Sequence, residues 1–163
     1  MRGERVNGVL PPLLVAASLA IAIVNAGARF RALMVFFATA AVIALFPIPA
    51  WASDAGHLAC WISIVACGAV AYAPYGVSAR FAIALAAGAG VSAGAVGTRA
   101  DAPALVVLVP LVAAVTMCAA RAAARHVPLA PKVVASWLIA VALLATLLQM
   151  LPVTPGYLPD HLE

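Results

Sequence analysis

The stretch VVASWLIAVALLATLLQML, residues 133–151, carries no charged side chain and is as long as a membrane-crossing helix. A helix needs roughly 20 predominantly apolar residues to cross a hydrocarbon core of about 30 Å. The apolar residues here run continuously, without the alternation of a transmembrane β-strand or the polar face of a soluble helix. The stretch therefore predicts a transmembrane helix.

Five further apolar stretches of similar length precede it, separated by short polar links. The 163-residue chain is 67% hydrophobic and 9% charged, with a mean hydropathy of +1.16. Soluble domains are about half apolar and a quarter charged. We therefore predict an all-α integral membrane protein, in which residues 1–163 form a single bundle of about six transmembrane helices with short loops. The expected spans are 9–25, 32–48, 57–73, 81–97, 104–120 and 133–151.

Links that are rich in Lys and Arg alternate along the chain with links that contain fewer of them. Cytoplasmic loops keep an excess of Lys and Arg, and Ala and Arg richness with minimal loops favours a bacterial-type inner (plasma) membrane. We expect the more basic set of links to be cytoplasmic and both termini to lie outside, with a five-span chain as the alternative. The first stretch also resembles a removable signal peptide. The basic set holds Arg29, Arg31, Arg80, Arg121, Arg125 and Lys132, and the other set holds Arg2, Arg5 and Arg99.

Small residues recur every four positions along the fourth span, at Ala82, Ala86, Gly90 and Gly94. This spacing places them on one helical face, and the last two form a GxxxG motif that lets two backbones approach closely. We predict a helix-packing face. Its partner could be another span, a second copy or a different protein, and another span of the same chain is favoured.

Prolines mark two of the expected spans. Pro110 lies in the middle of the fifth, where it removes a helical hydrogen bond and predicts a kink. Pro11 and Pro12 would begin the first span, where a missing N–H costs little.

The third span carries the one constellation that resembles site chemistry. His57, Cys60 and Cys67 share a helical face, and imidazole with thiolate ligands can hold a soft metal or haem iron. The two cysteines, however, stand about 10 Å apart along the helix, whereas tight sites use close pairs such as C-x₂-C. These three residues are weak metal candidates, and we predict no metal site and no cofactor.

Aromatic side chains lie near the expected span ends, including Trp61, Tyr72 and Trp137. Amphipathic rings prefer the headgroup level of a bilayer. We interpret them as interface anchors rather than as an aromatic cage for a substrate.

The link between the fifth and sixth spans is the strongest charged feature. Arg121 and Arg125 stand one helical turn apart, and Lys132 follows. On the cytoplasmic side these cations would contact anionic lipid or an acidic loop of a partner. The net charge of +4 comes without a basic stripe interleaved with aromatic residues, so no nucleic-acid partner is predicted.

No acidic residue lies inside any expected span, whereas ion-coupled carriers and proton pumps place such groups there. Candidate acid–base groups sit on the links, away from an evident pocket. We predict a non-enzymatic multi-pass protein that acts as a small subunit or assembly partner in a larger membrane complex or homo-oligomer. Its partners would be the lipid bilayer and other membrane subunits or copies of itself.

Two alternatives stay open. A redox or metal-binding membrane protein would use His57 and Cys60. A compact transporter or channel for a small solute or lipid would need a polar path, for which the candidates are Ser63, Ser92, Thr116 and Gln149.

Overall fold

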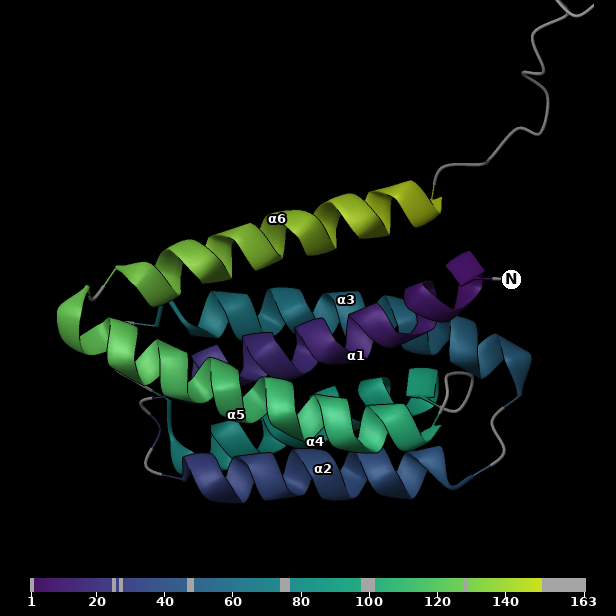
Figure 1. Ribbon diagram of the computed structural model, residues 1–163, viewed down its shortest axis with the longest axis horizontal. Helices are drawn as coiled ribbons and strands as arrows, with labels where there is room; N and C mark the ends of the chain where they lie inside the picture. Colours follow the sequence, from purple (N-terminus) through teal and green to yellow (C-terminus); the bar gives the residue numbers. More distant parts are fainter. Residues whose placement is uncertain are drawn as a thin grey trace, which may run out of the picture.

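The computed structural model describes residues 2–24, 26, 28–46, 49–73, 77–97, 102–127 and 129–150, without the side chains of 2–9, 50–54, 97, 102–108 and 123–125. This part of the chain contains six helices and no strand, which confirms the predicted all-α fold (Figure 1). The helices are α1 (Arg2–Ile23), α2 (Arg29–Ala44), α3 (Ala50–Val70), α4 (Ala79–Gly97), α5 (Ala102–His126) and α6 (Ala130–Met150).

Each helix covers one apolar stretch, but some extend beyond it. Helix α3 starts at Ala50, directly after an extended Pro49 (φ −63°, ψ 153°), because the residues after this proline include no helix breaker for a full turn. Helix α5 continues to His126 since residues 119–125 are alanine and arginine, which favour helix.

The first helix departs from expectation in a different way. It begins at Arg2, so that Pro11 and Pro12 lie inside it rather than at its start. An apolar stretch shows which residues can lie in the hydrocarbon of a bilayer, but it does not show where the helix begins. The helix can also include the polar residues that precede the stretch. Pro110 likewise lies inside α5, which runs on both sides of it as helix.

Successive helices run in opposite directions along the bundle, so that neighbours in the chain are antiparallel (Figure 1). Helix α1 passes through the middle of the bundle and contacts α3, α4 and α5. Its residues from Val15 to Val24 are buried almost without interruption, and Leu19 and Ile23 are fully enclosed. Helices α2 and α6 lie on opposite sides, with α2 against α4 and α6 mainly against α3.

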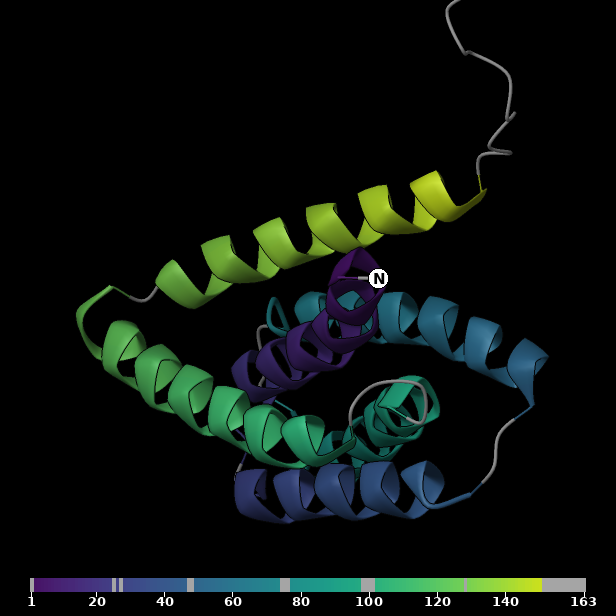
Figure 2. The same ribbon diagram turned by 45° about the vertical axis from the view of Figure 1, so that its right-hand side comes forward.

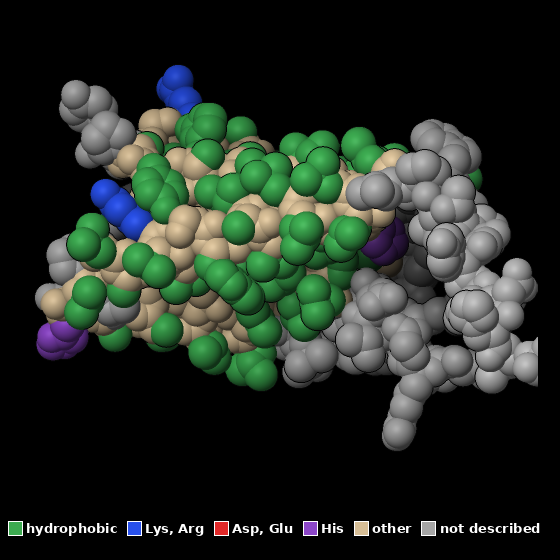
Figure 3. Space-filling model, turned by 90° about the horizontal axis from the view of Figure 1, so that it is seen from above, with side chains coloured by type: hydrophobic (Ala, Val, Ile, Leu, Met, Phe, Trp, Pro, Cys, Tyr) green, Lys and Arg blue, Asp and Glu red, His purple; other side chains and the backbone are tan. Residues whose placement is uncertain are grey.

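The Lys and Arg side chains that the structure describes gather at one end of the bundle. The up-and-down order brings the start of α2, the start of α4, the end of α5 and the start of α6 to one end. We call this the basic end, and Figure 3 shows Lys and Arg side chains there. Every Lys or Arg whose side chain the structure describes belongs to it, namely Arg29, Arg31, Arg80, Arg121 and Lys132.

Within the described residues, two helices are long and apolar enough to cross a membrane, Ala79–Val96 within α4 and Ala130–Met150. Shorter apolar helical runs occupy Leu10–Ile23, Ala55–Val70 and Val109–Ala122. Length and composition therefore give weak support for membrane association, and six spans stay a prediction.

Candidate functional site

The small-residue face of α4 lies against α2 of the same chain. Ala82 and Ala86 are fully buried, and Gly90 and Gly94 are buried as well. A Cβ atom built on Gly94 would lie 2.6 Å from the carbonyl oxygen of Ala40 on α2. The two backbones are therefore so close that only glycine fits at this position.

The next turn of the same contact involves Gly90. A Cβ atom there would meet the carbonyl oxygen of Phe36 at 2.5 Å and collide with the Thr39 hydroxyl. The Thr39 hydroxyl itself donates within α2, to the carbonyl oxygens of Val35 (2.8 Å) and Phe36 (3.0 Å). This contact is thus held by close packing rather than by hydrogen bonds between the helices.

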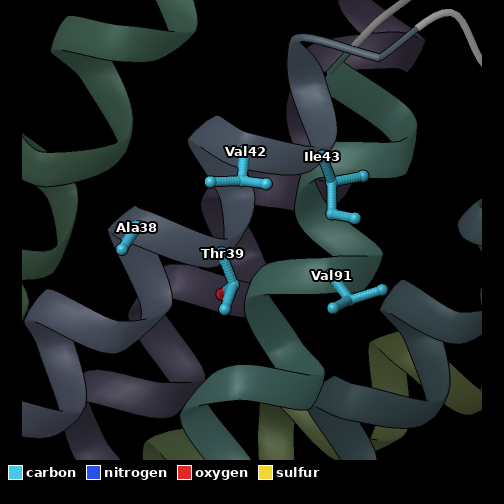
Figure 4. Close-up of a pocket in the computed structure, with 5 residues that line it drawn as sticks. All are labelled: Ala38, Thr39, Val42, Ile43 and Val91. Atoms are coloured by element: carbon cyan, nitrogen blue, oxygen red, sulfur yellow. The ribbon is translucent and has the colours of Figure 1, made fainter.

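A shallow apolar cavity of about 210 Å³ follows the same contact on the outside of the bundle (Figure 4). Because the Thr39 hydroxyl is occupied within its own helix, this groove offers a ligand little besides hydrocarbon. It fits a lipid chain in size and polarity but carries no group that selects one. Its lining residues are Ala38, Thr39, Val42, Ile43 and Val91.

Buried polar side chains form a seam between α3 and its neighbours. On the α4 side, the Ser63 and Ser92 hydroxyl oxygens lie 3.2 Å apart, and the Cys60 thiol lies beside Ser92. On the α1 side, the Cys67 thiol lies beside Ser18. The seam therefore brings together small polar side chains of three helices, while the serine hydroxyls donate to carbonyl oxygens of their own helices.

The three weak metal candidates do not share one cluster of ligands. Cys60 and Cys67 are fully buried and face different serines, while His57 is partly exposed near one end of α3. Among the residues that the structure describes, no group of three His, Cys, Asp or Glu side chains could hold a metal ion.

A second cavity, of about 280 Å³, lies where the first half of α1, the first half of α3 and the end of α6 meet. Its lining residues are Leu10, Pro11, His57, Trp61 and Gln149. Unlike the groove beside α2, it includes three side chains that can form hydrogen bonds. We call it the α1–α3–α6 cavity.

Trp61 in this cavity differs from its predicted role. An interface anchor would expose its ring to headgroups, but only 7% of Trp61 is accessible. Its Nε1–H is buried and, within the described part of the chain, has no hydrogen-bond partner. The position of Trp61 near the end of an expected span did not predict its exposure, because residues of α1 and α6 lie beside the ring. Trp137, in contrast, is 63% exposed.

The predicted basic contacts lie around the turn between α5 and α6. Arg121 is half-buried and Lys132 is exposed, while the side chain of Arg125 lies outside the described residues. The Tyr72 hydroxyl at the end of α3 donates to the carbonyl oxygen of Lys132 at 2.7 Å. This hydrogen bond fixes the start of α6 to the bundle at the basic end.

The four residues of the predicted polar path do not come together. Ser63 and Ser92 are in contact, but Thr116 is on α5, and Gln149 lines the cavity at the end of α6. Sequence reasoning did not identify Ser18 as the partner of Cys67, since their pairing depends on how α1 crosses α3.

Comparison with known proteins adds no functional information. No protein-family model, curated protein or solved structure matches the chain.

Proposed function

We propose that this chain is a multi-pass membrane protein that acts without catalysis, as a small subunit or assembly partner in a larger membrane complex or homo-oligomer. The observation that carries the proposal is the outer face of α6. Within the 18-residue apolar window of this helix, only 17% of the residues are buried inside the bundle.

The contact of α6 with the rest of the chain is narrow. Ala135, Leu138 and Ala142 are its buried residues, and all lie on one face. The remaining faces carry large apolar side chains, each between 46% and 67% exposed: Val133, Val134, Trp137, Leu143, Leu144, Leu147, Leu148 and Met150.

Soluble monomers rarely expose so large an apolar surface to water, and this supports a location in a membrane. Lipid alone could cover it. A helix that is attached along one narrow face and leans away from the bundle (Figures 1 and 2), however, gains additional van der Waals contact from a further helix. We therefore assign α6 as the docking helix for an apolar transmembrane segment of another subunit or of a second copy.

A non-catalytic role accords with the interior. The buried Ser18 and Ser92 hydroxyls donate to carbonyl oxygens of their own helices, at 2.9 Å in each case. The Cys60 and Cys67 thiols are engaged with serine side chains. Nucleophilic catalysis needs an activated group beside a site for substrate, and these groups serve helix packing instead.

The charge asymmetry supports an orientation. We place the basic end at the cytoplasmic face of a bacterial-type plasma membrane, with both termini outside, since cytoplasmic loops retain Lys and Arg. The Arg121 and Lys132 side chains would then face anionic headgroups or an acidic loop of a partner.

Purification from the native membrane in mild detergent, followed by mass spectrometry of the co-purifying proteins, tests the assembly role. We expect stoichiometric companions or a homo-oligomer. A double Leu144→Ala and Leu148→Ala variant should lose them, whereas the matched Met34→Ala and Leu45→Ala variant on the exposed side of α2 should keep them. A wild-type chain that purifies alone as a monomer would contradict the proposal.

A further inference from the structure

The α1–α3–α6 cavity is a half-open pocket rather than an enclosed packing void. The cavity measures about 280 Å³, just below the roughly 300–1,000 Å³ of pockets that hold small-molecule ligands. It therefore has room for the polar part of a ligand.

Trp61 supplies the second observation. Its side chain is 93% buried, and its indole N–H has no hydrogen-bond partner in the described residues, where no other buried side-chain N or O atom lacks one. A buried donor without an acceptor is costly. The ring lines the cavity, so a ligand acceptor that enters can satisfy this donor once the ring turns its N–H toward the cavity.

The cavity lies at the end of the bundle where α6 has moved away from α3 (Figures 1 and 2). At the basic end α6 is close to α3, where a Cβ atom built on Gly68 would lie 2.6 Å from the Ile139 side chain. Beside Gln149, the apolar side chains of Leu147, Leu148 and Met150 are exposed. These side chains offer a surface along which an apolar chain can lie and reach the cavity from the bilayer.

The cavity lining selects the chemistry of the ligand. Among the residues that the structure describes, the lining holds an indole donor, an amide from Gln149 and the imidazole of His57, and none of these described lining residues is Asp, Glu, Lys or Arg. Such a site suits an uncharged acceptor, and a carbonyl oxygen is the simplest match for the Trp61 N–H.

We propose that the α1–α3–α6 cavity binds the carbonyl end of a membrane amphiphile, with the Trp61 N–H as its donor and the exposed apolar side chains at the end of α6 in contact with its aliphatic tail. Two membrane components share this chemistry. One is an acyl ester lipid and the other is a quinone with an isoprenoid or alkyl chain. The test of this site is separate from the test of the assembly role, because Trp61→Phe changes the cavity and leaves Leu144 and Leu148 of α6 intact.

Nuclear magnetic resonance of the full chain with ¹⁵N-labelled tryptophan tests the proposal directly. Dioleoylglycerol and decylubiquinone would be titrated separately into the protein in detergent micelles. The Trp61 and Trp137 indole signals would be assigned with Trp61→Phe and Trp137→Phe. We expect the Trp61 N–H signal to shift downfield and to saturate with one of the probes, which identifies the ligand as lipid or quinone, while the exposed Trp137 signal stays in place.

Affinity gives a second readout. Trp61→Phe keeps the ring volume but removes the donor, and we expect it to weaken binding by about fivefold, as for the loss of one neutral hydrogen bond. Trp137→Phe should bind as wild type. If Trp61→Phe fails to fold, Gln149→Leu at the exposed helix end should weaken binding instead. No saturable shift with either probe, or equal shifts of the Trp61 and Trp137 signals, would overturn the proposal.

Discussion

Replacing Gly94 by alanine probes the closest helix contact in the bundle. The added Cβ atom would lie 2.6 Å from the Ala40 carbonyl oxygen, 3.1 Å from the Ala40 Cα and 2.9 Å from the Ile43 Cβ, where ordinary contacts begin near 3.4 Å. Two of these three atoms are backbone and cannot rotate away. Helix α2 must therefore move outward by nearly 1 Å along this contact.

Gly88, on the same helix, provides the matched control. A Cβ atom there would meet nothing within 4 Å. Both alanine variants gain about 1 kcal/mol of helix propensity over glycine. The difference between their free energies of unfolding therefore reports the cost of the steric clash at Gly94. Overpacking of this kind costs about 1–3 kcal/mol. At about 2–4 °C per kcal/mol for a chain of this size, Gly94→Ala should melt about 2–12 °C below Gly88→Ala.

The cysteines provide the assay for this comparison. Cys60 and Cys67 are fully buried in the seam, and Cys118 is exposed. In a Cys118→Ala background, a fluorescent maleimide should react only as the bundle opens on heating. Gly94→Ala and Gly88→Ala melting within 1 °C of each other would refute the close contact of α2 with α4.

Three further outcomes follow from the same structure. Gly68→Ala should cost less than Gly94→Ala, because its nearest neighbours are side-chain atoms of Ile139 that can shift; melting in the maleimide assay measures this, and an equal or larger loss would contradict it. At room temperature the native protein in detergent should react with maleimide at Cys118 alone, and rapid labelling of Cys60 or Cys67 by mass spectrometry would show that the seam is open. Tyr72→Phe removes the hydrogen bond to the Lys132 carbonyl oxygen and should lower stability by about 0.5–1.5 kcal/mol; hydrogen exchange should then rise at the start of α6, and unchanged exchange there would argue against its role as an anchor.

The helices were largely predictable from the sequence, because hydrocarbon-length apolar runs have few alternatives to helix. Their ends were less so. Residues 50–56 read as a link, yet α3 begins at Ala50, since alanine-rich polar segments can continue a helix when no proline intervenes. Pro11 and Pro12 read as a helix start but lie inside α1.

The contacts between helices depended on information that a single sequence does not carry. The four-residue spacing of Gly90 and Gly94 indicated a packing face, but only the fold shows α2 against it. The position of Trp61 near a span end indicated an interface anchor, and its burial follows from the crossing of α1 and α6 over α3. The pairing of Cys67 with Ser18 likewise depends on which helices meet.

The central claim is that the helices cross a membrane with the basic end inside. Labelling of introduced cysteines with a membrane-impermeant maleimide, in right-side-out and inverted vesicles, tests this most directly. In a Cys118→Ala background, in which the remaining Cys60 and Cys67 are buried, Ser78→Cys and Val127→Cys report the basic end, and Phe46→Cys and Ala55→Cys report the other end.

We predict that Ser78→Cys and Val127→Cys label only in inverted vesicles, and that Phe46→Cys and Ala55→Cys label only in right-side-out vesicles. Labelling of all four positions from the same side, or recovery of the protein in the soluble fraction, would contradict the account.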